Sequence, residues 1–227
     1  MKISLGRKLA AEFLGTAFLL VAVVGSGIMA ERLAHGNMAL ALLANALATG
    51  AALAALILTF ASVSGAHFNP VVTLADAYLS GTAWKAGLSY VAAQIAGAFS
   101  GVVAAHAMFG LPAFTASQQV RNGRGQVFSE IIATMGLLLV IAGCSRRNAA
   151  ATPYAVGAYI TAAYWFTAST SFANPAVTLA RCFTDTFAGI RPADAPAFIL
   201  AQLLAAILAA FLARWLFRTG KVAEAAS

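Results

Sequence analysis

Two short stretches decide the fold: NPVVTLA at residues 69–75 and NPAVTLA at residues 174–180. Asparagine followed by proline is a typical helix start, because the asparagine oxygen can accept backbone N–H groups that the first turn leaves unpaired. Each stretch lies among apolar residues but is too short to cross a hydrocarbon layer of about 30 Å. We therefore expect each to be a re-entrant loop that descends to the middle of a membrane and returns as a half-helix.

The composition indicates a chain that has lipid as its solvent. Of the 227 residues, 61% are hydrophobic and only 9% are charged, whereas a soluble domain is about half apolar and a quarter charged. The net charge of +7 would suggest a nucleic-acid partner in a soluble protein. Here the basic residues stand between long uncharged runs without interleaved aromatics, so we expect no nucleic-acid partner and relate them to membrane orientation.

Six apolar stretches are long enough to span a bilayer. They cover residues 9–30, 38–61, 85–107, 126–144, 153–170 and 194–217. Of the 14 Lys and Arg residues, nine fall on the side of the N-terminus and the other five on the opposite side. Because cytoplasmic loops carry the excess of basic residues, this moderate bias predicts an integral membrane protein with both termini in the cytoplasm.

The sequence repeats itself once, with the same three signals in the same order. The signals are AEFLGT (11–16) and SEIIAT (129–134), the two Asn-Pro stretches, and Ala-Gln at 93–94 and 201–202. Each half holds three spans, an odd number, so the second half must enter the membrane from the opposite face. We expect one channel domain over residues 1–227, built as an inverted repeat of about 1–115 and 116–227.

The inverted repeat has an electrostatic consequence, because the two half-helices would meet start to start. Each helix start carries the equivalent of about half a positive charge, so the meeting point repels cations and protons but not neutral solutes. The amide N–H groups of Asn69 and Asn174 would orient a passing water and break a proton wire. A loop turn explains one Asn-Pro equally well, but two matched copies argue against it. The predicted central constriction comprises Asn69, Pro70, Val71, Asn174, Pro175 and Ala176.

These motifs resemble those of the major intrinsic proteins, the aquaporins and aquaglyceroporins. The resemblance covers nearly the whole chain and includes AEFLGT (11–16), SGAHFNP (64–70) and NPA (174–176). It implies an all-α membrane protein, with a right-handed bundle of six tilted helices and two half-helices. It further implies a homotetramer with one pore per chain, located in a bacterial plasma membrane. The implied function is that of a passive channel for small neutral solutes, without enzyme activity, metal or cofactor.

The resemblance also locates a selectivity filter, which this chain alters. In the family an aromatic, a histidine or glycine, a small residue and an arginine line the narrowest point, on the outer side. The matching positions here are Thr49 for the aromatic, Ser171 for the loop residue, Val177 for the arginine, and one of Ala162, Ala163 and Tyr164 on the fifth span. We expect a filter without its arginine and aromatic, similar to bacterial aquaglyceroporin-like channels associated with arsenic handling. Such a pore would pass water, glycerol, urea and undissociated metalloid acids such as arsenite.

Four charged or titratable residues near the motifs have two interpretations each. Arg181, one turn beyond Val177, either replaces the lost arginine or, as we favour, is an interfacial residue paired with Asp185. Glu12 and Glu130 are either a proton relay or, as we favour, acceptors for backbone N–H groups of the re-entrant loops. His67 is either a pH sensor or, as we favour, a hydrogen-bonded loop anchor in the inner vestibule.

Three other functions compete with a channel for several small solutes. A water-selective aquaporin would share every motif except the altered filter. An ion-coupled secondary transporter can also have inverted repeats and broken helices, but it would need charged side chains where this chain places asparagines. An enzyme would need a nucleophile with a base, paired carboxylates or a metal cluster. The sequence offers none of these patterns, and Cys144 and Cys182 have no metal-ligand spacing.

Overall fold

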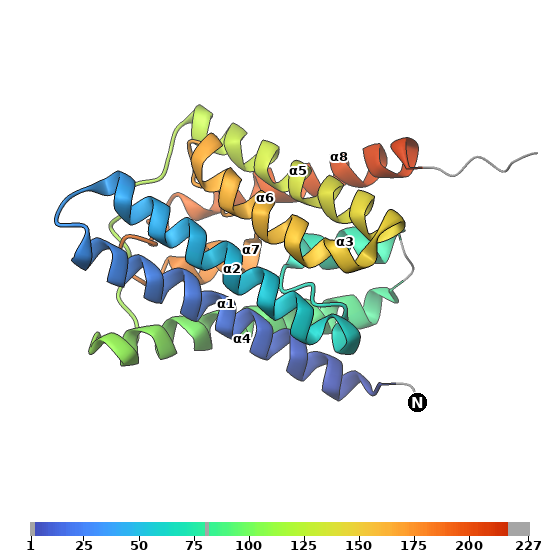
Figure 1. Cartoon of the computed structure of the whole chain (residues 1–227), viewed down its shortest axis with the longest axis horizontal. Coiled ribbons are helices and arrows are strands. Elements are labelled where there is room, and N and C mark those ends of the chain that lie inside the picture. The colour runs from blue at the N-terminus through green and yellow to red at the C-terminus, as the bar shows by residue number, and fades with distance from the viewer. Residues whose placement is uncertain (1–2, 80–81, 218–227) are drawn as a thin grey trace, which may run out of the picture.

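The computed structural model describes residues 3–79 and 82–217, and within these ranges every regular element is helical (Figure 1). The helices are α1 (Leu5–Leu33), α2 (Met38–Ser64), α3 (Pro70–Leu79), α4 (Trp84–Phe109), α5 (Arg124–Arg147), the 3₁₀ turn η1 (Ala149–Ala151), α6 (Thr152–Phe166), α7 (Pro175–Arg181) and α8 (Ala195–Leu216). The order of two helices, a half-helix and a further helix therefore occurs twice, in α1–α4 and in α5–α8. The boundary between repeats at about residue 115 stays a prediction.

The six predicted spans correspond to α1, α2, α4, α5, α6 and α8, with different ends. Five of these helices are long and apolar enough to cross a membrane, while α6 has 15 residues and is the short one. It ends at Phe166, four residues before the predicted end, because the backbone of Thr167 is extended, with φ −111° and ψ 139°. The chain then turns through Thr170 and Ser171, whose φ angles are 61° and 53°.

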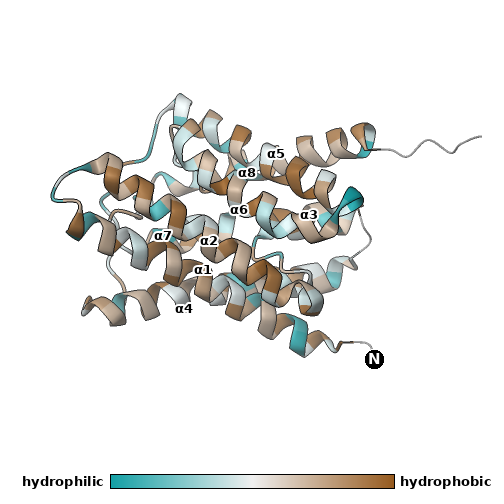
Figure 2. Cartoon of the chain, viewed as in Figure 1, coloured by the Kyte–Doolittle hydropathy of each residue, from teal (hydrophilic) through white to brown (hydrophobic). Residues whose placement is uncertain are grey.

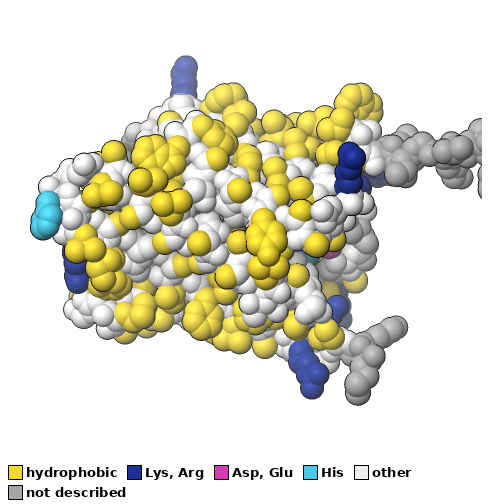
Figure 3. Space-filling view, in the orientation of Figure 1, with side chains coloured by type: hydrophobic (Ala, Val, Ile, Leu, Met, Phe, Trp, Pro, Cys, Tyr) yellow, Lys and Arg dark blue, Asp and Glu magenta, His cyan; other side chains and the backbone are white. Residues whose placement is uncertain are grey.

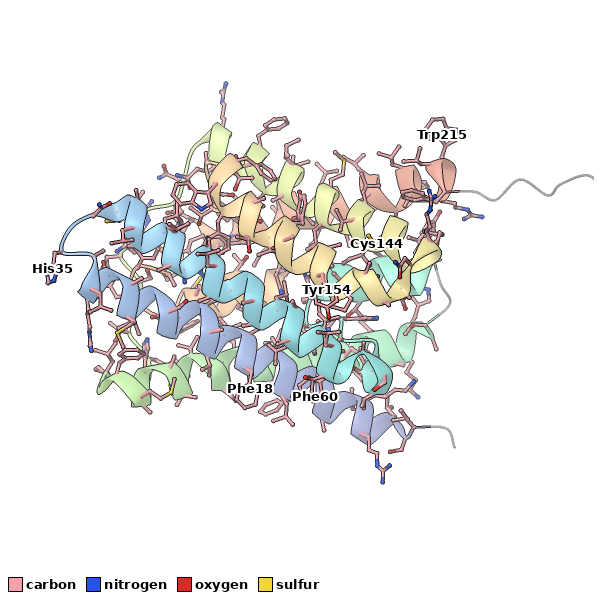
Figure 4. The ribbon with its side chains drawn as sticks, viewed as in Figure 1. Phe18, His35, Phe60, Cys144, Tyr154 and Trp215 are labelled. Atoms are coloured by element: carbon pink, nitrogen blue, oxygen red, sulfur yellow. The ribbon has the colours of Figure 1, made fainter. Side chains whose placement is uncertain are left out.

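The long helices run roughly along the long axis of the molecule, and the half-helices α3 and α7 lie between them (Figure 1). The start of α1 and the end of α8 lie at the same end of the bundle. Apolar residues are frequent along the long helices (Figure 2). In the space-filling view, apolar side chains are spread over the flank, and Lys and Arg lie mainly toward its two ends (Figure 3). Phe18, Tyr154 and Trp215, labelled in Figure 4, are each more than half exposed. The flank is therefore suited to lipid contact.

Small residues allow the helices to approach each other closely. At the crossing of α2 and α6, a Cβ atom on Gly157 would lie 2.5 Å from the carbonyl oxygen of Gly50. On α4, added Cβ atoms at Gly97 and Gly101 would collide with the backbone of α1. Close approach of this kind is how helices gain packing energy in lipid, where apolar burial itself supplies little. The resulting compact walls surround the two half-helices.

Candidate pore

Each half-helix begins at the proline of an Asn-Pro pair, and the asparagine side chain caps it. The Asn69 Oδ1 atom accepts the backbone N–H of Val71 at 3.0 Å. The Asn174 Oδ1 atom accepts those of Ala176 at 3.0 Å and Val177 at 3.3 Å. Capping by the side-chain oxygen, as the sequence predicts, turns each amide nitrogen away from its own helix.

The two amide groups bind the opposite repeat. The Asn69 Nδ2 atom donates to the carbonyl of Ala173 at 2.7 Å, and the Asn174 Nδ2 atom donates to the carbonyl of Phe68 at 2.8 Å. These reciprocal bonds hold the two helix starts together. Each amide has two N–H groups, so one remains on each asparagine for a solute. The sequence predicted free amide N–H groups on both asparagines, and one N–H of each is instead used between the repeats.

Two fully buried carboxylates hold the loops that lead to the half-helices. Glu12 of α1 accepts the backbone N–H groups of His67 at 3.0 Å and Phe68 at 2.8 Å. Glu130 of α5 accepts those of Phe172 at 2.9 Å and Ala173 at 2.8 Å. Irregular backbone at membrane depth must find such partners inside the protein. These contacts agree with the structural interpretation of both glutamates.

A glutamine in each half ties its carboxylate to its half-helix. The Gln94 Nε2 atom lies 2.8 Å from Glu12 and 2.9 Å from the hydroxyl of Thr73 on α3. The Gln202 Nε2 atom lies 2.6 Å from Glu130 and 2.9 Å from the hydroxyl of Thr178 on α7. The Ala-Gln signal of the sequence repeat thus has a physical cause, because in each half the glutamine links the buried glutamate to the half-helix.

One cavity of about 500 Å³ reaches past both asparagines. We call the part of the cavity toward α3 the α3 end, and its wall includes His67, Asp76 and Arg146. We call the part toward α7 the α7 end, and its wall includes Tyr164 and Phe172. Of the six residues predicted to form the central constriction, only Asn69 and Asn174 line the cavity. The others, Pro70, Val71, Pro175 and Ala176, are buried or packed in the first turns of the half-helices.

The predicted filter residues gather at the α7 end, with one exception. Thr49, Tyr164, Ser171 and Val177 line the cavity, whereas the fully buried Ala163 does not. The hydroxyl of Tyr164 lies 3.3 Å from that of Thr49. The second-span position is a threonine, and of the three candidates on the fifth span Tyr164 turns its ring inward beside Thr49.

Arg181 also lies at the α7 end, buried and 2% exposed. Its Nε atom donates to the carbonyl of Ala188, and its guanidinium carbon lies 3.5 Å from the centre of the Phe172 ring. Asp185 instead accepts the backbone N–H of Gln118 at 2.9 Å. The interfacial Arg181–Asp185 pair that we favoured is therefore wrong, because the loop after α7 folds back and offers the Ala188 carbonyl, and the loop before α7 offers the Phe172 ring.

Arg121, from the loop between α4 and α5, supports the same aromatic ring. Its Nε atom donates to the carbonyl of Gly189 at 2.7 Å, and its Nη2 atom donates to that of Phe187 at 3.1 Å. Its guanidinium carbon lies 5.2 Å from the centre of the Phe172 ring. Sequence reasoning missed Arg121 and Phe172 because neither stands in a motif, and a lone arginine in a loop carries no signal of burial.

At the α3 end, His67 both lines the cavity and anchors its loop. Its Nδ1 atom lies 3.1 Å from the hydroxyl of Thr73, and its Nε2 atom lies 4.0 Å from a carboxylate oxygen of Asp76. Arg146 reaches the same end of the cavity while donating to the carbonyl of Ala142 at 3.0 Å. This placement agrees with the loop-anchor interpretation of His67.

Comparison with known proteins places this geometry in a family. The profile of the family described as Major intrinsic protein matches residues 1–171. A relative, Aquaglyceroporin AqpS of Rhizobium meliloti (strain 1021), is 51% identical over 217 residues, which cover 96% of this chain and 93% of that protein. The chain belongs to the major intrinsic protein family. As a member of this family it is a membrane channel and not an enzyme.

More distant members share parts of the sequence or the fold. Aquaporin NIP6-1 of Arabidopsis thaliana is 35% identical over 141 residues, which are 61% of this chain and 45% of that protein. The X-ray structure of the aquaglyceroporin from Plasmodium falciparum is 24% identical, covers 95% of this chain and 98% of its own, and superposes with a TM-score of 0.75. At that identity the likeness shows the fold alone, and it confirms the predicted aquaporin-like bundle.

Proposed function

We propose that this family member passes water and small uncharged solutes, including glycerol, urea and undissociated metalloid acids such as arsenite. The observation that carries the proposal is the single cavity that reaches past both asparagine-capped helix starts. Two such starts repel cations by their dipoles, while the remaining amide N–H groups can donate to a water or a solute hydroxyl. The relationship to an aquaglyceroporin over nearly the whole chain supports the same range of solutes.

Val177 supports solutes larger than water. Its isopropyl group lies on the cavity wall directly after the second Asn-Pro-Ala, on the first turn of α7. A valine there occupies less of the path than an arginine and removes its donors and its charge. Because pore diameter and lining donors decide selectivity, this substitution favours passage of small polyols.

The alternative of a water-selective channel has one observation in its favour. Tyr164, Phe172 and Arg181 all contribute to the cavity wall at the α7 end, so large side chains remain close to the path that Val177 opens. If they set the narrowest point, water would pass and glycerol would not. The experiment below separates the two functions.

The test measures light scattering of proteoliposomes after a hyperosmotic glycerol pulse. We expect the natural chain to give fast shrinkage followed by fast reswelling. Val177→Arg should keep fast shrinkage and slow the reswelling by roughly tenfold or more, because the guanidinium fills the path. Val177→Ile, which adds one methyl group and no charge, should reswell like the natural chain. Fast shrinkage without reswelling in the natural chain would establish the water-selective alternative.

Location and assembly complete the proposal. The start of α1 and the end of α8 lie at one end of the bundle, and the excess of Lys and Arg on that side favours the cytoplasm for both. A bacterial plasma membrane follows from the bacterial relative, and a homotetramer from the family resemblance. Protease access to a terminal tag in intact and in everted vesicles checks the orientation, and cross-linking in the membrane checks the assembly.

A further inference from the structure

Arg181, the last residue of α7, is a buried charge on the wall of the cavity. We propose that Arg181 is the residue that excludes cations at the α7 end of the pore and presents hydrogen-bond donors to the passing solute. The inference rests on the proposed function only in taking this cavity as the permeation path. It adds a second barrier to cations beside the two helix starts.

Within the described residues, the charge of Arg181 has no acidic partner in direct contact. The side-chain contacts there between a basic and an acidic group are His67 with Asp76 and Arg191 with Asp194, and neither involves Arg181. Removing a guanidinium from water is costly unless something compensates, so a charge kept at membrane depth without a counter-ion indicates a functional role. Its field adds to that of the half-helix starts and opposes any cation that enters from this end.

The donors of Arg181 are only partly used by the protein. Its Nε atom binds the carbonyl of Ala188, while its two terminal amino groups have no hydrogen-bond acceptor within the described part of the chain. Nearby on the same wall, the buried hydroxyl of Ser171 also lacks a partner among the described residues. Unpaired buried polar groups are rare, and both residues line the cavity, where a solute oxygen can accept from the free Arg181 donors. The matching solute is uncharged and carries hydroxyl or carbonyl oxygens.

Phe172 and Arg121 fix the position of the Arg181 guanidinium. It lies on the Phe172 ring at 3.5 Å from the centroid, and Arg121 contacts the same ring at 5.2 Å. Arg121 does not line the cavity and donates to backbone carbonyls of the loop that also supplies Ala188. Phe172 and Arg121 are therefore positioning residues, and Arg181 is the group that faces the pore.

The test compares cation leak and water flux in the same proteoliposomes, with Arg181→Met and Arg181→Lys. We expect Arg181→Met to raise the potassium leak by roughly tenfold or more, because the charge at the wall is gone. Osmotic shrinkage is recorded in the same vesicles to show that the variant has inserted and is open. Arg181→Lys keeps the charge and should stay tight near neutral pH. Arg124→Met, which removes an exposed arginine outside the cavity, is the matched control and should not leak. A tight Arg181→Met channel with normal water flux would overturn the proposal, as would equal leaks in the Met and Lys variants.

A pH series on Arg181→Lys keeps the proposal testable even if Arg181→Met does not fold. A buried lysine loses its proton more readily than a free one, whereas the arginine guanidinium stays charged. The potassium leak of Arg181→Lys should therefore rise between pH 7 and pH 10. The potassium leak of the natural chain should not change over the same range. The titratable or charged neighbours, Tyr164, Arg121, Glu130 and Cys182, are present in both proteins. An equal rise in both, or none in either, would contradict the role of Arg181. Because the readout is potassium, these results stand apart from whether glycerol passes.

Discussion

A buried glutamate in each repeat holds the backbone on which the pore depends. Glu12 and Glu130 lie on different long helices, yet each accepts two backbone N–H groups from the re-entrant loop of its own half. The two asparagines then cap the half-helices and bind across to the other repeat. At this scale the solute path is defined by hydrogen bonds, since a loop without acceptors would not remain at membrane depth.

Removing the carboxylate of Glu130 should destabilise the whole channel. In Glu130→Leu the N–H groups of Phe172 and Ala173 lose their acceptors, at a cost of roughly 1–3 kcal/mol each. We expect a clearly lower unfolding temperature in detergent and little solute flux. Glu31→Leu is the control, because its carboxylate is exposed and accepts a single loop N–H at 3.3 Å. Equal unfolding temperatures for the two variants would show that the Glu130 bonds contribute little.

At the scale of elements, the walls of the pore depend on close helix crossings. The contact between α2 and α6 brings Gly50 and Gly157 together, and α6 carries Tyr164 to the cavity two turns further along the same helix. A displacement of α6 would therefore move a pore-lining ring as well as loosen the bundle. Packing and selectivity are coupled through this short helix.

Gly157→Leu tests this coupling. The added side chain meets the Gly50 backbone, and overpacking of this kind typically costs about 1–3 kcal/mol. We expect a lower unfolding temperature, and altered glycerol permeability in whatever protein folds. Gly6→Leu serves as the control, because a Cβ atom there would meet nothing within 4 Å. If both variants unfold and conduct like the natural chain, the crossing is looser than the structure indicates.

For the whole molecule, the sequence predicted most of the fold and a smaller part of the pore wall. Apolar length, the repeated Glu, Asn-Pro and Ala-Gln signals and the family resemblance located the spans and both half-helices, because these features are local in the chain. The α7 end was predicted less well. The inward course of Arg181 depends on Ala188 and Phe172, and the place of Arg121 depends on the loop carbonyls of Gly189 and Phe187. Contacts between distant loops leave no periodic signal in a sequence.

If the cavity past the two asparagines is the route of the solute, a reagent bound to a cysteine on its wall must block the flux. In a background without Cys144 and Cys182, Ser171→Cys puts a thiol at the α7 end, and Ser100→Cys puts one on the exposed face of α4. We predict that a mercurial reagent stops water and glycerol flux through Ser171→Cys, that a free thiol restores both, and that Ser100→Cys is unaffected. Undiminished flux through a fully labelled Ser171→Cys channel would contradict the account.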